Sequence, residues 1–247
     1  SFLGGLVYAD TFKLVRFRDV GLTIAVGCCA AFLAMLINNA LVDRTGLSFV
    51  SYSRYLAPLV EESLKAAYLI YLLRSNRVGF MVDAAIRGVA IGAGFALVEN
   101  LYYLTMRPDA PVYLWVIRGF GTAIMHGGAT AMAGIIARGM SERAEWTRVR
   151  FILSGLVAAI LLHSLFNHFF LAPMLSTLLV LAGVPLAVFA VFRRSEAATR
   201  TWLGVGFDSD QELLAMITTG TLADTRIGHY LETMQNSFPG EIVADML

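Results

Sequence analysis

Long apolar runs alternate with short polar connections along most of the chain. Hydropathy windows predict six runs, each long enough to cross roughly 30 Å of hydrocarbon as a helix: about 21–41, 54–74, 79–104, 112–137, 149–170 and 172–193. Strands of an open sheet would leave backbone groups unsatisfied in lipid, so these runs are predicted to be helices. The pattern therefore predicts an all-α, polytopic membrane helix bundle with about six transmembrane helices.

The segments outside these runs are more polar. Residues 1–20 are expected to be a cytoplasmic N-terminal segment or the stub of an upstream helix, and residues 21–194 the transmembrane domain that holds the candidate catalytic residues. After Arg194, Ser209 and Glu212 form a capping-box pattern that begins a short helix, and a second amphipathic stretch follows Gly220. We expect 195–247 to be a cytoplasmic helical tail, suited to docking or to homo-oligomerisation.

Composition agrees with a protein of the lipid bilayer. Hydrophobic residues make up 57% of the chain and charged residues 15%, against about a quarter charged in soluble domains. The net charge of +1 gives no indication of nucleic-acid binding. Cys28 and Cys29 are adjacent in an apolar run, which is a poor arrangement for a structural disulfide.

Basic residues mark alternate connections. They cluster before the first run and after the second, fourth and sixth, at Lys13, Arg16, Arg18, Arg74, Arg77, Arg138, Arg143, Arg148, Arg150, Arg193, Arg194 and Arg200. Because basic residues are retained on the cytoplasmic side, both termini are predicted to be cytoplasmic. The connections near Arg44, Pro108 and Pro173 are predicted to face outward.

Ionisable and amide side chains interrupt four of the apolar runs. An ionisable group at mid-bilayer costs roughly 2.5 to 3.5 kcal/mol on insertion scales, so each is a functional candidate: Glu61, Glu62, Lys65, Asp83, Arg87, Glu99, Asn100, Arg118, His126, His163, Asn167 and His168. Such groups can also simply hydrogen-bond helices together. Asp83 and Arg87, one turn apart, are most simply a local ion pair.

The predicted topology gives each candidate a depth. At 1.5 Å per residue, Glu62, Glu99 and His163 lie about 12, 8 and 10 Å below the outer boundary, and His126 about 15 to 21 Å. The four helices can therefore bring these side chains together in the outer half of the membrane. Two histidines, a carboxylate and a spare glutamate suit zinc-dependent hydrolysis, because three ligands leave a position for water and the glutamate accepts its proton.

Four short motifs carry a resemblance to a known family. They are Glu61-Glu62-Ser63-Leu64-Lys65, Phe95 to Glu99-Asn100, Arg118 to His126, and His163-Ser164-Leu165-Phe166-Asn167. In order and topology this set resembles the PrsW-type intramembrane proteases, distant relatives of the CAAX prenyl endopeptidases, over about residues 10–193. The resemblance implies a multi-pass protease of the bacterial or archaeal cytoplasmic (inner) membrane. Such an enzyme makes site-1-type cuts in a single-pass membrane protein such as an anti-sigma factor.

The resemblance also implies roles for individual residues. Glu61 and Glu62 match the paired-glutamate motif, Glu99 stands where the prenyl endopeptidases have histidine, and His163 with Asn167 matches their histidine-asparagine motif. Our working hypothesis has Glu99, His126 and His163 binding one zinc ion. Glu62 acts as general base with Glu61 assisting, Lys65 tunes the carboxylates, and Asn167 steadies the oxyanion.

Three other interpretations fit parts of the pattern. A metal-free protease would use a glutamate and a histidine as general base and acid. An ion- or proton-coupled transporter would use the same residues as a relay, although the sequence shows neither an internal repeat nor paired broken helices. A non-catalytic receptor or chaperone would tolerate alanine at Glu62 and His163.

Overall fold

The computed structural model describes residues 3–5, 16–75, 77–78, 80–139, 145–191 and 193. The chain divides into two compact units, Ser1–Ser195 and Glu196–Leu247. The second unit, with the predicted tail helices and the capping box at Ser209, lies outside the described residues. The described residues form helices and no strand, which confirms the all-α prediction.

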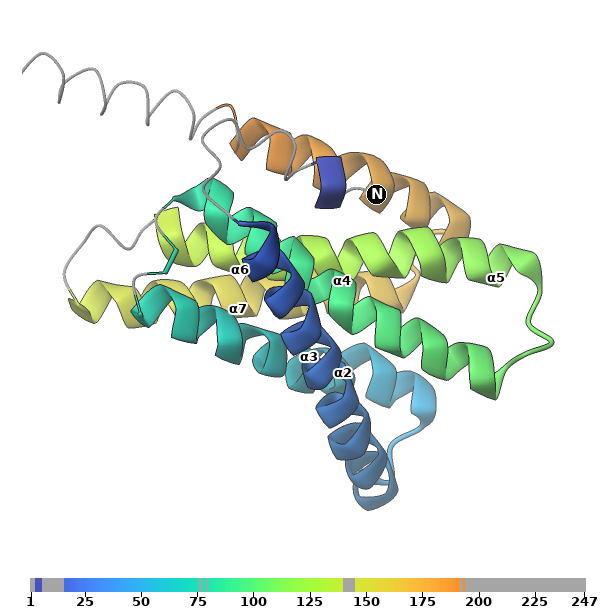
Figure 1. Cartoon of the computed structure of the whole chain (residues 1–247). Helices are drawn as coiled ribbons and strands as arrows, with labels where there is room; N and C mark the ends of the chain where they lie inside the picture. Colours follow the sequence, from blue (N-terminus) through green and yellow to red (C-terminus); the bar gives the residue numbers. More distant parts are fainter. Residues whose placement is uncertain are drawn as a thin grey trace, which may run out of the picture. The chain divides into compact units, whose positions relative to one another are not determined.

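The helices follow the predicted runs closely. They are α2 (Phe17–Thr45), α3 (Phe49–Arg74), α4 (Met81–Met106), α5 (Val112–Val116), η1 (Ile117–Thr122), α6 (Ala123–Gly139), α7 (Glu145–His168) and a helix over Pro173–Val191 (Figure 1). Their ends have local causes. Gly46 ends α2 in a left-handed conformation (φ 64°), and the Ser48 hydroxyl caps α3 by accepting the Ser51 N–H at 3.2 Å.

Five helical segments in the described part of the chain are long and apolar enough to cross a membrane: α2, α4, the continuous helix from α5 to α6, α7 and Pro173–Val191. Helix α3 is as long as α4, at 26 residues, but carries Glu61, Glu62 and Lys65 in its middle and is not among the five. The predicted polytopic helix bundle is confirmed. Helix α3 is thus less apolar because its middle places three ionisable side chains in the interior.

Glycines bring α4 against its neighbours. A methyl group at Gly92 would overlap the backbone of His126 and Gly127 on α6, and one at Gly88 would overlap Ala131. Small residues allow such close backbone approach between membrane helices. The contact holds α4 and α6 side by side over much of their length (Figure 1). It also determines which residues of α6 face Glu99, about two turns beyond Gly92 along α4.

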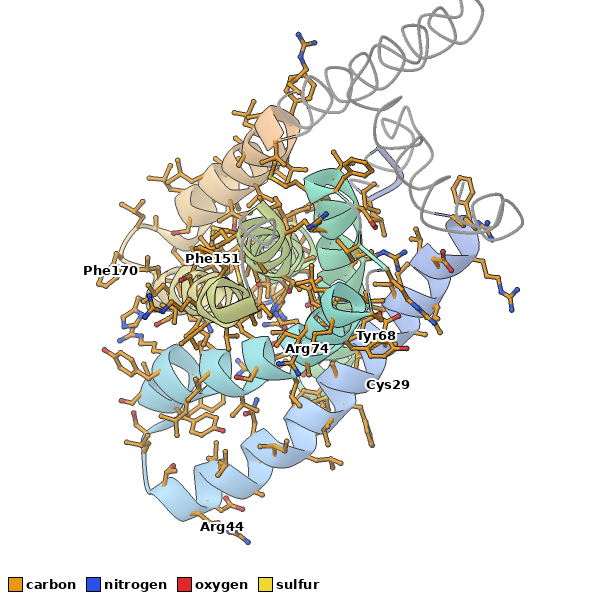
Figure 2. All side chains as sticks on the ribbon, turned by 90° about the vertical axis from the view of Figure 1, so that its left-hand side faces the viewer. Cys29, Arg44, Tyr68, Arg74, Phe151 and Phe170 are labelled. Carbon is orange, nitrogen blue, oxygen red and sulfur yellow. The ribbon has the colours of Figure 1, made fainter. Side chains whose placement is uncertain are left out.

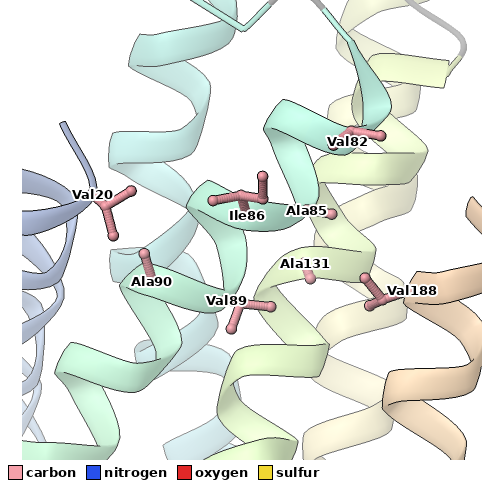
Figure 3. Packing of buried hydrophobic residues seen from close by; sticks show 8 residues of the cluster. All are labelled: Val20, Val82, Ala85, Ile86, Val89, Ala90, Ala131 and Val188. Carbon is pink, nitrogen blue, oxygen red and sulfur yellow. The ribbon is translucent and has the colours of Figure 1, made fainter. Parts of the chain in front are cut away.

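An apolar cluster fills the part of the bundle near the start of α2 and α4. Figure 3 shows valine, alanine and isoleucine side chains of α4 meeting one residue each from α2, α6 and the helix Pro173–Val191, the cluster being Val20, Val82, Ala85, Ile86, Val89, Ala90, Ala131 and Val188. Large apolar side chains also project outward, as Figure 2 shows for Phe170 just after α7, which is 75% exposed. Such apolar surface is typical of lipid-facing helices.

The continuous helix over Val112–Gly139 departs from the predicted regular α-helix. Its residues Ile117–Thr122 form a π-helix, in which the Ala123 N–H bonds to the Arg118 carbonyl five residues back. Asn100 of α4 donates a side-chain hydrogen bond to the same carbonyl at 3.4 Å. A π turn holds about one residue more than an α turn and is frequent at functional sites.

Candidate active site

A cavity of about 300 Å³ lies where helices α2, α3, α4, η1, α6 and α7 meet. Five of the predicted site residues line it, namely Glu61, Glu99, His126, His163 and Asn167. Its wall also contains Asn38, Tyr52 and Arg118. Glu62 is not part of the wall. The structure thus brings the predicted histidines and two of the three predicted glutamates to one space.

His126 has both ring nitrogens engaged. Nδ1 lies 3.0 Å from Lys65 Nζ, and Nε2 lies 3.0 Å from Glu99 Oε2. An ammonium group only donates, so Nδ1 accepts from Lys65 and Nε2–H donates to Glu99. Both histidine and lysine are fully buried. The lysine and the glutamate therefore define the orientation of the His126 ring at the cavity wall.

Glu62 lies behind His163. Its Oε1 accepts from Lys65 Nζ at 2.5 Å and lies 2.8 Å from His163 Nδ1. Because an ionised carboxylate only accepts, Nδ1 carries the proton and Nε2 keeps its lone pair. A carboxylate behind a histidine in this way is the usual arrangement for a histidine that binds a metal through its other nitrogen. The structure thus places Glu62 where it can orient His163.

One carboxylate oxygen of Glu61 accepts a hydrogen bond, and the other has no hydrogen-bond partner. Asn38 Nδ2 of α2 donates to Oε1 at 3.1 Å, and the Tyr52 hydroxyl donates to Asn38 Oδ1 at 2.9 Å. Oε2 is buried without a hydrogen-bond partner and lies 3.9 Å from His163 Nε2. Sequence reasoning missed Asn38 and Tyr52. The signal available for Asn38 was the pair of amides at Asn38 and Asn39 within the apolar run 21–41.

The donor set fits a metal ion. In the described part of the chain, Glu61, His126 and His163 each offer a ligand atom, and these atoms lie within 4.8 Å of one another. The unpartnered Glu61 Oε2 and the free lone pair of His163 Nε2 belong to this set. Glu99, which we expected as a ligand, instead contacts His126 Nε2 from α4 and is 3.2 Å from Arg118 Nη2.

Asn167 and Ser164 fasten the end of α7 to the start of α3. Pro58 has no N–H, so the carbonyl of Arg54 four residues earlier loses its helical partner. Ser164 Oγ donates to that carbonyl at 2.6 Å, and Asn167 Nδ2 donates to the Ser53 carbonyl at 2.9 Å. The amide for which we predicted an oxyanion role therefore has one N–H engaged in holding the two helices together.

Comparison with families of known proteins agrees with this arrangement. A family model described as PrsW family intramembrane metalloprotease matches residues 17–193, which include every residue of the cavity wall. Comparisons with curated proteins and with solved structures find no match. Since the family match covers well over half of the chain, this protein belongs to the PrsW family of intramembrane metalloproteases.

Proposed function

We propose that the cavity is the active site of an intramembrane metallo-endopeptidase that hydrolyses peptide bonds of a single-pass membrane protein. The observation that carries the proposal is the convergence of Glu61, His126 and His163 from three helices, with Glu61 Oε2 left without a partner. Burying an unpaired carboxylate oxygen costs free energy, and a ligand that needs that oxygen explains its retention.

Glu61, His126 and His163 would hold one zinc ion, since two histidines and one carboxylate are a common ligand set of catalytic zinc sites. His126 would bind through Nδ1 in place of its contact with Lys65 and keep its Nε2–H on Glu99. When bound, zinc acts as a Lewis acid that makes water a nucleophile near neutral pH. Glu62 orients His163, and Lys65 neutralises Glu62. This assignment exchanges the roles predicted from the sequence for Glu61, Glu62 and Glu99.

Glu99 is the carboxylate placed to accept a proton from the attacking water. It lines the cavity from α4 and takes a hydrogen bond from His126 Nε2. After the water adds to the scissile carbonyl, Glu99 returns the proton to the leaving nitrogen as the C–N bond breaks. Glu62 is less suited to this step, because it is 1% exposed and lies outside the cavity wall.

The cavity also bears on how substrate enters. Its wall includes Val42 near the end of α2 and Phe49 at the start of α3, beside the connection that the charge pattern predicts to face outward. We propose that an extended segment enters from that side, because a helical peptide hides its carbonyls. As part of the proposal we keep site-1-type cleavage by a protein of the bacterial or archaeal cytoplasmic membrane with both termini cytoplasmic, as predicted from the resemblance and the charge pattern. A possible homo-oligomer through 195–247 stays a prediction.

The test combines metal content with cleavage. Detergent-purified protein is expected to contain about one zinc per chain by mass spectrometry, lost in Glu61→Ala, His126→Ala and His163→Ala. His168→Ala is the matched control, since His168 is on α7 but makes its Nδ1 contact with the Ser164 carbonyl outside the cavity wall. In proteoliposomes with a panel of single-pass membrane proteins, Glu99→Gln should keep the zinc and lose cleavage.

Two results would contradict the proposal. Protein that cleaves without bound metal, in the presence of chelator, would indicate the metal-free glutamate and histidine protease. Ion uptake by the proteoliposomes with no cleavage of any panel member would indicate a transporter instead.

A further inference from the structure

The guanidinium group of Arg118 is a cavity-wall cation that the protein leaves partly unsatisfied. Its Nε and Nη2 are buried without a hydrogen-bond partner, although Nη2 lies 3.2 Å from Glu99 Oε2. The flat face of the group stacks on the Tyr103 ring, 3.6 Å from its centroid. The position of the group is therefore well defined, while Nε and Nη2 still have hydrogen bonds to donate. A buried donor without a partner needs an explanation.

The π-helix is what turns Arg118 toward the site. In a regular α-helix, Arg118 and His126 are eight residues apart, and their side chains would point roughly 80° apart around the axis. One additional residue in the turn makes the spacing equivalent to seven, which puts both on nearly the same face. Both residues in fact contact the same atom, Glu99 Oε2, at 3.2 and 3.0 Å.

The chemistry of hydrolysis provides a partner for these donors. When the water oxygen bonds to the scissile carbonyl carbon and its proton passes to Glu99, the carbonyl π pair moves onto oxygen and leaves an oxyanion. Donors fixed before reaction stabilise such a charge strongly in a site with little water. A planar guanidinium offers several N–H groups in fixed directions, which suits an anionic oxygen.

We propose that Arg118 is a catalytic residue that binds the oxygen of the scissile carbonyl and stabilises the oxyanion. The inference rests on the proposed peptidase function and deepens it. Asn167, the sequence-based candidate for this role, already donates Nδ2 to the Ser53 carbonyl. Arg118 has donors to spare on the same cavity wall.

The test uses two apolar tetrapeptide probes. In one, an anionic tetrahedral phosphinate replaces the scissile amide, and in the other a ketomethylene group keeps a trigonal carbonyl. The wild type is expected to bind the phosphinate about 100-fold more tightly than the ketomethylene probe. Arg118→Gln should lose about 10- to 100-fold of that preference. Arg118→Lys should lose less, because it keeps the positive charge but not the planar set of N–H donors.

A second test changes the direction of the Arg118 side chain while keeping the arginine, by deleting Gly119. Gly119 lies within the π-helix, and a Cβ there would meet nothing within 4 Å. If the deletion closes the π turn into an α turn, Arg118 rotates by about 100°, and the phosphinate preference should fall as in Arg118→Gln. Gly119→Ala keeps the residue count and is the matched control, expected to behave as wild type.

The outcomes are distinct. A wild type that prefers the phosphinate while Arg118→Gln keeps that preference overturns the inference and leaves the peptidase proposal intact. A folded wild type without any phosphinate preference overturns both. A third outcome would come from the double variant. If adding Arg118→Gln to Glu99→Gln causes no further loss of the phosphinate preference, Arg118 acts only by positioning Glu99, and the catalytic role is overturned.

Discussion

Arg87 and Arg118 each pair with a carboxylate of the bundle, and they differ in how well their hydrogen bonds are satisfied. Arg87 Nε donates to Asp83 Oδ1 at 2.7 Å within α4, and its Nη2 lies 3.9 Å from Asp19 of α2. Arg118 approaches Glu99 at 3.2 Å from another helix, with Nε and Nη2 lacking hydrogen-bond partners. The first pair is a structural contact, as the one-turn spacing predicted. The second pair leaves donors of Arg118 available for a bound molecule.

The same contrast separates the polar groups around the cavity. Glu62, Lys65, Ser164 and Asn167 find protein partners, whereas Glu61 Oε2 and Arg118 Nε do not. Buried polar groups are normally paired, because an unpaired one costs about 1–3 kcal/mol or more when charged. Glu61 Oε2 and Arg118 Nε, which both lie at the cavity, are therefore the groups to which we assign the proposed metal and substrate.

Replacing each arginine in turn by glutamine should separate the two pairs most clearly. We expect Arg87→Gln to lower the free energy of unfolding by about 3 kcal/mol, because it leaves Asp83 without its charged partner in the interior. Arg118→Gln should lower it by less than about 1 kcal/mol, because Glu99 keeps its hydrogen bond from His126 Nε2 and its side chain is 20% exposed, so it does not lose its only partner. Denaturant unfolding of both variants in the same detergent measures this. Equal losses would contradict the distinction.

Glu62→Gln sharpens the contrast between the two neighbouring glutamates. If Glu62 orients His163, zinc affinity should fall about 10- to 100-fold, as for other groups behind a ligating histidine. Glu61→Ala should abolish binding, because it removes a ligand. Competition titration with a chromophoric chelator measures both, with His168→Ala as control. Unchanged zinc affinity together with lost cleavage would instead support the general-base role first predicted for Glu62.

The smallest effect concerns the fastening of α7 to α3. Ser164→Ala should lower the free energy of unfolding by about 1 kcal/mol, because it leaves the Arg54 carbonyl without a donor. In a Pro58→Ala background the new backbone N–H can bond that carbonyl, so Ser164→Ala should then have a smaller effect. A double-mutant cycle by denaturant unfolding measures the coupling. Additive effects would show that Pro58 is not the reason for the contact.

The apolar periodicity of the chain was sufficient to predict the helices and their order. The predicted runs 79–104 and 112–137 match Met81–Met106 and Val112–Gly139 closely, because a membrane leaves the backbone few alternatives to helix. The π-helix was not predictable, since the two glycines of Ile117–Thr122 weaken an α-helix without specifying a π turn. Without that turn, Arg118 could not be assigned to the face of His126.

The candidate site was predictable only as a set of residues. The cost of burying charge in lipid singles out Glu61, Glu62, Glu99, His126 and His163 wherever they lie along their helices. Which glutamate faces the cavity depends on contacts between helices far apart in sequence. Asn38 reaches Glu61 from α2, and His163 reaches Glu62 from α7. One residue of shift along a helix turns a side chain by about 100°, so neighbouring glutamates with the same chemistry take different places once the helices pack.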